Sequence, residues 1–162
     1  MKIKCQINGH TCVLPSFLTR FLVKPLFLYC STITPNGKPQ IQPIIFVNEL
    51  GKCNIAFLVK KQSSLTRNLQ KNPKLALTTD ETHPTDPLKN KGIMIEAVSQ
   101  LNDSKDEVEE CFNYLRKKYN SDIVTKILGI DIILNYVKIQ AFPVKIVYWK
   151  GPFFKKFKCN QR

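Results

Sequence analysis

Short apolar runs separated by turn-forming residues predict three strands in the first part of the chain. The run at 26–34 is rich in aromatic and β-branched side chains, which favour strands. The sequence Pro-Asn-Gly-Lys at 35–38 is typical of a turn. Residues 39–49 begin with polar and apolar positions in alternation, and residues 53–60 form a third apolar run. We expect these three strands to form an antiparallel meander.

Three more strands are expected farther along the chain. They cover residues 74–80, 92–101 and 137–150. Because proline has no N–H group to donate to a neighbouring strand, we expect the last of them to be interrupted at Pro143.

Apolar residues at helical spacing predict helices before and between these strands and within the second half of the chain. Residues 15–24 place four apolar side chains on one face, and residues 65–72 follow a serine that suits a helix N-cap. A longer helix begins within residues 103–107, where acidic side chains suit the positive end of the helix dipole. Its apolar face consists of Val108, Cys111, Phe112 and Leu115. A short helix is expected at 121–130.

About six strands with interspersed helices favour a mainly β, α+β fold in the form of a small antiparallel barrel. The chain has 162 residues, 43% of them hydrophobic, with no internal repeat or low-complexity linker. We therefore expect one domain over residues 1–162. No stretch approaches the roughly 20 consecutive apolar residues of a membrane span. Since the N-terminal segment also lacks the pattern of a signal peptide, a cytoplasmic protein is expected.

The formal net charge of +13 is distributed in blocks along the chain. Residues 1–79 carry eleven Lys or Arg and one acidic residue, Glu49, whereas residues 80–110 carry nine acidic residues and three basic ones. Residues 111–162 return to eleven basic and two acidic residues. This balance points to an anionic ligand, of which nucleic acid is one class.

The C-terminal tail, residues 152–162, continues a segment from Tyr148 to Lys158 in which aromatic and basic residues are interleaved. Such a segment can stack on bases and neutralise phosphates, or settle on an anionic membrane surface. The alternative is a final strand that ends in a solvated, partly frayed basic terminus. The sequence leaves these interpretations open.

Cysteine and histidine offer little evidence for a metal site or for nucleophilic catalysis. No two cysteines form a Cys-x-x-Cys pair, and Cys5, His10 and Cys12 make only a loose group. We expect the cysteines to be small buried apolar residues and not disulfides. Neither His10 nor His83 lies in a catalytic pattern, so no general acid or base stands out. The six cysteines are Cys5, Cys12, Cys30, Cys53, Cys111 and Cys159.

The most specific motif lies between Ser63 and Leu77, where Arg-Asn-Leu at 67–69 is followed by Asn-Pro at 72–73. Taken with the order of strands and turns over about residues 14–151, this motif resembles the pyridoxamine 5′-phosphate oxidase-like, FMN-binding split-barrel family. The resemblance implies a six-stranded antiparallel split β-barrel with peripheral helices. It also implies a homodimer with two flavin sites at the subunit interface.

The resemblance further implies which residues hold the flavin. In such proteins the second and third strands line the isoalloxazine ring, and the polar crossing with the next helix start holds the phosphate. The corresponding ring-lining residues are Gln42, Pro43, Ile44, Phe57 and Leu58. The corresponding phosphate-binding residues are Lys60, Lys61, Ser63, Ser64, Thr66 and Arg67. The partner subunit contributes Lys91, a candidate to stabilise anionic reduced flavin, and Trp149.

The chain departs from the family pattern at three places. The Arg-Lys pair that many relatives place on the phosphate falls on Ser64 and Leu65, and a further phosphate-binding Arg falls on Gln42. The substrate-binding residues of true pyridoxamine phosphate oxidases have no counterpart near the C-terminus. We therefore expect an FMN-dependent oxidoreductase of another specificity. The alternatives are a non-enzymatic flavin- or nucleic-acid-binding module of this fold, or a relative that binds haem or a deazaflavin coenzyme.

Each of these residues also has a purely structural interpretation. Ser63 and Ser64 can cap a helix, and Gln42 can satisfy a hydrogen bond inside the barrel. Trp149 can be a packed interface aromatic, and Lys91 an ordinary charged loop residue. The basic group of Lys60, Lys61 and Arg67 can form a solvated face.

Overall fold

The computed structural model describes residues 2–7, 10–15, 22–49, 54–129 and 132–159. Its strands are β1 (Lys2–Ile7), β2 (His10–Pro15), β3 (Leu28–Ile33), β4 (Pro39–Ile44), β5 (Val47–Glu49), β6 (Asn54–Lys60), β7 (Lys74–Glu81), β8 (Lys91–Asn102), β9 (Tyr136–Lys150) and β10 (Phe153–Lys158). Its helices are α2 (Ser64–Lys71), η2 (Pro87–Lys89, a 3-10 turn), α3 (Lys105–Tyr119), α4 (Ser121–Leu128) and α5 (Ile132–Asn135). Within these ranges, no helix has both the length and the apolar character needed to cross a membrane.

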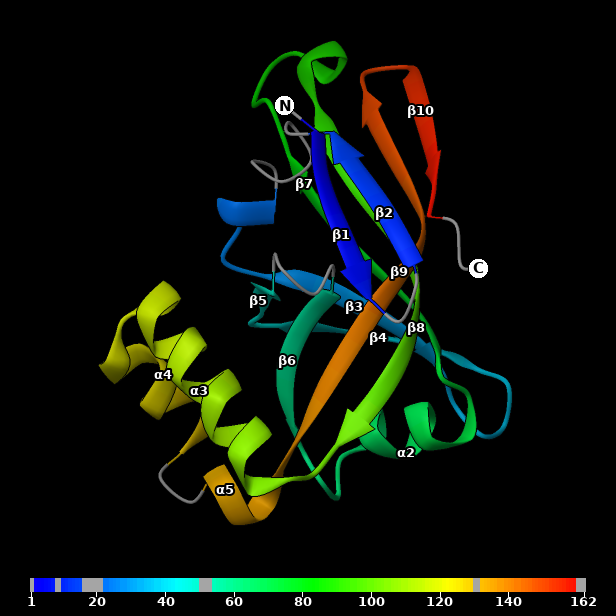
Figure 1. The fold of residues 1–162 in the computed structure, drawn as a ribbon. Coiled ribbons are helices and arrows are strands. Elements are labelled where there is room, and N and C mark those ends of the chain that lie inside the picture. Colours follow the sequence, from blue (N-terminus) through cyan, green and yellow to red (C-terminus); the bar gives the residue numbers. More distant parts are fainter. Residues whose placement is uncertain (1, 8–9, 16–21, 50–53, 130–131, 160–162) are drawn as a thin grey trace.

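One antiparallel sheet of eight strands dominates the fold, and all six expected strand regions contribute to it. Its order is β4-β3-β7-β8-β9-β6-β5, with β10 paired to β9. The helices α3 and α4 lie beside β5 and β6, whereas α2 lies near the end of β8 (Figure 1). This is the mainly β, α+β architecture of a split barrel.

The expected meander is only partly correct. Strand β4 pairs with β3 as expected, but β6 pairs with β5 and β9 and not with β4. The reason is a break at Ile45 and Phe46, which divides the expected strand 39–49 into β4 and β5. These two halves lie at opposite ends of the strand order although only two residues separate them. The sheet must therefore curl on itself, with its two edges adjoining at this break.

Helix α3 holds the break in place through its last turn. The Tyr119 hydroxyl donates to the carbonyl oxygen of Phe46 at 3.0 Å and accepts from the Phe46 N–H at 3.2 Å. Lys118 Nζ donates to the same carbonyl at 3.1 Å and lies 3.3 Å from the centre of the Phe46 ring. Burial lowers the pKa of Lys118 to about 8 and raises the pKa of Tyr119 to about 12. The main chain at the break is thus satisfied by side chains where no strand can satisfy it.

The last long strand, β9, runs without the expected interruption at Pro143. Its first part, up to Ala141, pairs with β6, and its last part, from Lys145, pairs with β10. Pro143 lies between these two regions and next to a register shift at Glu96/Ala97 in β8. Proline is tolerated there because its missing N–H falls where β9 changes partners and bulges.

Two terminal segments add strands that the sequence left undecided or did not indicate. The hairpin of β1 and β2 was not expected. The tail forms β10, an ordered strand on β9, and Cys159 beyond it is buried. The expected helix at 15–24 lies mostly outside the described residues. The expected helices at 65–72 and 121–130, and the longer helix before the latter, correspond to α2, α4 and α3.

Two apolar cores lie on the two faces of the sheet. The larger one fills the inside of the barrel and includes Phe57, and the smaller one lies beneath α3 and includes Leu58. Alternation along β6 sends these neighbouring side chains to opposite faces. The expected apolar face of α3 is confirmed, because Val108, Cys111 and Leu115 are fully buried in the smaller core. Phe112 packs against the same core.

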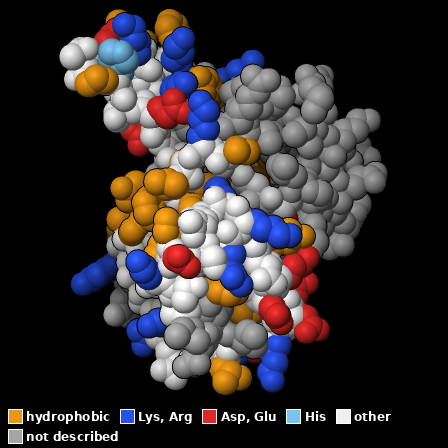
Figure 2. Space-filling model, turned by 90° about the vertical axis from the view of Figure 1, so that its left-hand side faces the viewer, with side chains coloured by type: hydrophobic (Ala, Val, Ile, Leu, Met, Phe, Trp, Pro, Cys, Tyr) orange, Lys and Arg blue, Asp and Glu red, His pale blue; other side chains and the backbone are white. Residues whose placement is uncertain are grey.

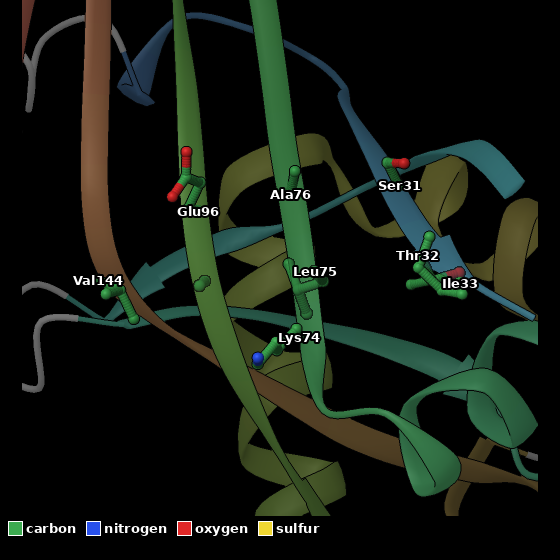
Figure 3. A pocket seen from close by; sticks show the side chains of 9 residues that line it. Ser31, Thr32, Ile33, Lys74, Leu75, Ala76, Glu96 and Val144 are labelled. Atoms are coloured by element: carbon green, nitrogen blue, oxygen red, sulfur yellow. The ribbon is translucent and has the colours of Figure 1, made fainter. Parts of the chain in front are cut away.

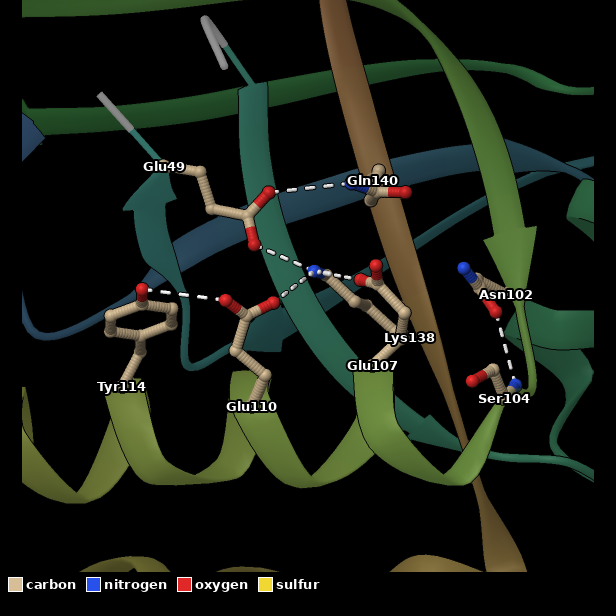
Figure 4. Close-up of polar contacts among 8 residues, drawn as sticks. All are labelled: Glu49, Asn102, Ser104, Glu107, Glu110, Tyr114, Lys138 and Gln140. Carbon is tan, nitrogen blue, oxygen red and sulfur yellow. Dashed lines mark hydrogen bonds and ion pairs between the residues drawn. The ribbon is translucent and has the colours of Figure 1, made fainter. Parts of the chain in front are cut away.

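A buried ion cluster joins β9, β5 and α3 (Figure 4). The Lys138 side chain is fully buried, and its Nζ lies 2.6 Å from a Glu49 carboxylate oxygen and 2.6 Å from a Glu107 oxygen. Glu110 lies 3.9 Å away, and Gln140 donates to Glu49 at 3.3 Å. Taking a lysine out of water is costly, and here two close carboxylates offset that cost.

The cluster keeps its members charged. Burial would raise the pKa of Glu49, but hydrogen bonding and attraction to Lys138 outweigh burial and hold that pKa below its ordinary value. Burial would lower the pKa of Lys138, but hydrogen bonds to Glu107 and Glu49 raise it above its ordinary value. The lone acidic residue of the first 79 positions is thus the counter-ion of a buried lysine.

Replacing Lys138 by Met is expected to lower the free energy of unfolding by about 3–5 kcal/mol, because Glu49 is then left as a buried carboxylate without its cation. Urea unfolding measures the change. Lys145→Met on the same strand is the matched control, since Lys145 and Glu96 are 2.5 Å apart but partly exposed. The control is expected to cost at most about 1 kcal/mol. Equal losses in the two variants would refute a special role for the buried cluster.

The same cluster predicts how stability depends on pH. The folded pKa of Glu49 lies below its ordinary value of 4.5, so its contribution is present above about pH 4.5 and is lost as pH falls through the folded pKa. The folded pKa of Lys138 lies above 10.5, so its contribution is lost only as pH rises beyond that value. In urea unfolding, the stability difference between the native chain and Glu49→Gln is therefore expected to shrink on acidification below pH 4.5. A constant difference would contradict this account.

Candidate functional site

The first turn of α2 lies against β4 through side-chain hydrogen bonds. Gln40 on β4 donates from its amide nitrogen to the Ser64 hydroxyl at 3.0 Å and accepts from the Asn68 amide at 2.9 Å. Asn68 also donates to the Thr32 hydroxyl on β3 at 3.0 Å. Asn68 is almost fully buried, as are Leu65 and Leu69 on the same helix face. The Arg-Asn-Leu motif thus fixes the helix start beside the edge strand.

The start of α2 is capped by the serine that the sequence indicates. Ser63 Oγ accepts from the Thr66 N–H at 3.1 Å and lies 2.9 Å from the Thr66 hydroxyl. The Thr66 hydroxyl donates to the Lys60 carbonyl at 2.7 Å. Ser63 therefore caps the helix, which is the structural role considered for it, and Thr66 supports that cap. Within the described residues, the amides of Ser64 and Leu65 have no acceptor.

Three basic side chains surround this helix start. Lys60, Lys61 and Arg67 are all exposed. Leu65, at one of the positions of the Arg-Lys pair in relatives, points into the core with 1% exposure and can offer only its amide. Free amides, a serine hydroxyl and nearby bases make a donor set that fits a phosphate.

The expected ring-lining residues differ in accessibility. On β4, Pro43 is exposed, Gln42 is half-buried and Ile44 is buried. Phe57 and Leu58 are buried in the two cores, so their side chains offer no surface to a ligand in the single chain. Strand β4 ends the strand order, so one of its edges has no neighbouring strand among the described residues. Such an edge leaves main-chain groups free, and its two prolines suit that position.

Lys91 and Trp149 lie together at the other end of the sheet. Lys91 Nζ contacts Glu81 at 2.9 Å, and the hydrogen bond and charge of Glu81 raise the pKa of Lys91. Trp149 is the cross-strand partner of Gly92, and its indole covers that glycine. A β-carbon at Gly92 would lie 2.1 Å from Trp149 Cζ2, so glycine is required for this packing.

Within a single chain, the start of α2 lies far from Lys91 and Trp149. The N–H of Ser99 donates to the carbonyl of Pro73, just after α2, at 2.7 Å, so α2 lies near the far end of β8. Lys91 begins β8, eight residues before Ser99. At about 3.3 Å per residue, roughly 25 Å of strand separates the two ends. We call residues 60–67 with the adjoining residues 42–44 of β4 one candidate half-site, and Lys91 with Trp149 the other. Only residues 60–67 are separated from Lys91 by this length of strand, because Gln42 and Pro43 are in register with Ile95 and Met94 of β8 through β3 and β7.

Large apolar side chains are exposed near and along β3 and β4. The register places Tyr29, Ile33 and Ile41 on one face of these strands. Figure 2 shows hydrophobic side chains gathered below the projecting loop that carries the histidine. Exposed apolar surface of this kind is typical of a contact with another protein. The exposed residues are Leu26, Phe27, Tyr29, Ile33 and Ile41, each between 38% and 64%.

An open pocket of about 450 Å³ lies between β3, β7 and β8 (Figure 3). None of the expected site residues lines it. Its polar side chains include Ser31, Lys74 and Glu96. A smaller pocket of about 320 Å³ lies near Lys24 and Asp80. No expected site residue lines the smaller pocket either, but Glu81, the partner of Lys91, does.

Cysteine and histidine form no metal-binding group within the described residues. Cys30, Cys111 and Cys159 are buried, as expected. Burial raises the pKa of Cys30 and of Cys111 to about 12, which opposes thiolate chemistry. Cys5 and Cys12 are cross-strand partners in the pairing of β1 with β2.

Sequence reasoning missed Gln40 and Lys138. Gln40 resembled any polar residue of an alternating strand, and only its neighbours on α2 show its role. Lys138 carried a usable signal, because it is a lysine within the apolar run that opens β9.

A family model for pyridoxamine 5′-phosphate oxidase matches residues 14–142. No curated protein matches the chain by sequence. Solved structures with similar folds have low identity. A conserved hypothetical protein from Mycobacterium tuberculosis has 14% identity and a TM-score of 0.71, with 91% of each chain covered.

Two further structures carry functional descriptions. A haem-binding protein from Mycobacterium smegmatis has 14% identity and a TM-score of 0.69, with 85% of this chain and 55% of that chain covered. An F420 reductase has 17% identity and a TM-score of 0.63, with 82% of this chain and 98% of that chain covered. At such identities the likeness establishes the fold alone. With most of its length matched by the family model, the chain belongs to the pyridoxamine 5′-phosphate oxidase family.

Proposed function

We propose that the protein is a homodimeric FMN-binding oxidoreductase whose two flavin sites lie between the subunits. The observation that carries this proposal is the separation of the half-sites along β8. A two-fold dimer can place the α2 end of one subunit beside the Lys91 end of the other. The exposed apolar side chains of β3 and β4 supply a surface for such a dimer.

The α2 end suits the flavin phosphate. The amides of Ser64 and Leu65 offer donors at a helix N-terminus, and the Ser64 hydroxyl keeps a proton to donate while it accepts from Gln40. Lys60, Lys61 and Arg67 supply the positive charge that the usual Arg-Lys pair gives in relatives. Gln42 replaces a further Arg, so this chain relies on main-chain donors and flexible exposed bases.

The ring would lie along β4, whose outer edge has free main-chain groups. Bound FMN supplies the hydride-transfer chemistry, and the chain binds and orients it. From the partner subunit, Trp149 offers an aromatic surface and Lys91 a positive charge for anionic reduced flavin. Lys91 is held by Glu81 in the single chain, so it must share or leave that contact to serve the flavin. The chemistry proposed is oxidation or reduction of a small molecule other than pyridoxamine phosphate.

Complementation between defective subunits tests the proposal. Lys61→Glu/Arg67→Glu disables one half-site, and Lys91→Glu/Trp149→Ala disables the other. Each variant alone is expected to lose FMN binding, measured from the flavin absorbance of the purified protein after incubation with FMN. A heterodimer purified through two different tags is expected to regain half of the wild-type occupancy, because one of its two sites contains both intact halves.

The control is Lys126→Glu on the exposed face of α4, which is expected to bind FMN like the native chain. Light scattering is expected to show a dimer for every variant. A monomeric native protein, or a heterodimer with no bound FMN, would contradict a shared site. A Soret band on adding hemin would assign haem as the cofactor in place of FMN. Uptake of a deazaflavin without uptake of FMN would assign a deazaflavin coenzyme.

A further inference from the structure

The end of the molecule beyond Lys91 is a compact projection made by two turns. We call it the apical tip and define it as η2 (Pro87–Lys89) together with residues 150–156 of the β9–β10 hairpin. Both turns lie at the top of Figure 1. The Gly151 N–H donates to the Asn90 carbonyl at 2.7 Å, which ties the hairpin to the end of η2. Gly151 has a φ of +52°, and a β-carbon there would lie 2.7 Å from the Leu88 carbonyl oxygen.

The apical tip exposes its largest apolar side chains. Phe153 is 78% exposed, Phe154 is 67% exposed and Leu88 is 65% exposed. Phe157, farther along β10, packs against the barrel core, so the hairpin is anchored to the body of the protein. Three exposed apolar side chains gathered on one projection are typical of a surface that contacts a partner.

Lysines surround these apolar side chains. Lys150, Lys155 and Lys156 are exposed, and Lys158 continues the row along β10. In the described part of the chain, no carboxylate forms an ion pair with any of these four lysines. Of the nearby acidic residues, Asp86 pairs with Lys89 at 3.2 Å and Glu81 pairs with Lys91, whereas the exposed Asp80 lies on β7, three strands from β10. The tip therefore presents uncompensated positive charge around an apolar end.

The shape of the tip favours a membrane over a nucleic acid. Successive strand residues point to opposite faces, so Phe153 and Phe154 cannot form one stacking platform. Leu88 has no aromatic face to offer a base. Neither pocket described above includes a tip residue. An apolar end flanked by lysines on both faces of β10 matches the layered chemistry of an anionic bilayer, which places phosphate above hydrocarbon.

We propose that the apical tip docks on anionic membrane surfaces, with Leu88, Phe153 and Phe154 entering the headgroup region and the lysines contacting lipid phosphates. This inference does not depend on flavin binding. It gives the interleaved aromatic and basic tail a role that the cofactor site leaves unexplained.

Vesicle co-sedimentation of the native protein tests the docking. Vesicles of phosphatidylglycerol and phosphatidylcholine are expected to bind the protein, and vesicles of phosphatidylcholine alone are expected to bind it far less. Phe153→Ser/Phe154→Ser is expected to weaken binding at least about tenfold, because it removes the inserted apolar area. Lys155→Gln/Lys156→Gln is expected to weaken it by about fivefold per lysine and to reduce its salt dependence.

The matched controls lie on α4, outside the tip. Ile127→Ser removes an exposed apolar side chain, and Lys126→Gln removes an exposed charge, so neither is expected to change vesicle binding. Trp149 is the only tryptophan in the sequence and adjoins the tip, so its fluorescence reports whether the tip lies near the acyl chains. Lipids brominated on their acyl chains are expected to quench Trp149 in the native protein but not in the Phe153→Ser/Phe154→Ser variant.

Three outcomes would overturn the proposal. The first is no difference between anionic and neutral vesicles. The second is equal binding by the tip variants and the α4 controls. The third is that the phenylalanine variant changes the oligomeric state or single-stranded DNA binding while vesicle binding stays the same, which would assign the tip to a subunit contact or to nucleic acid.

Discussion

The buried charge of Lys138 is the constraint that fixes the arrangement of this fold. It lies on β9 and draws Glu49 from β5 and Glu107 from α3 to its ammonium group. A lysine without water tolerates no loss of these partners, so one edge strand and the longest helix are held to the same point. The last turn of that helix then satisfies the main chain at Phe46. The position of the break between β4 and β5 is therefore coupled to an ion cluster that includes Glu49, three residues beyond Phe46.

The candidate cofactor site depends in turn on where that break leaves β4. Because the chain departs from β4 at Ile45, this strand keeps an open edge, and Gln40 holds α2 beside it. Asn68 completes the attachment by reaching Thr32 on β3. The exposed groups that could meet an anion thus stand on a rigid base of buried amide and hydroxyl contacts. Such a base keeps a binding site in place without using the ligand itself for order.

Local sequence patterns were sufficient to predict most of the strands and helices. Apolar runs and turn residues located the six strand regions, and the Ser63 cap located α2, because these features depend on near neighbours. The break at Ile45–Phe46 could not be predicted, since Tyr119 and Lys118, which stabilise it, lie more than 70 residues away. The expected interruption at Pro143 was wrong for a similar reason. Proline is tolerated there because β9 changes its partner from β6 to β10 around this position. The expected site residues rest on family resemblance and remain a prediction, whereas the Gln40 and Asn68 network required the packed structure.

The place of β9 in the sheet has a consequence for biosynthesis. This strand pairs with β6, β8 and β10, yet it begins only at Tyr136. Until the ribosome has released it, β6 and β8 have unpaired edges and the Glu49 carboxylate lacks its lysine. The nascent chain can form local hairpins such as β7–β8, but the barrel can close around its core only after β9 has been synthesised. Until β9 has emerged, the edges of β6 and β8 are therefore open to wrong pairing with other strands.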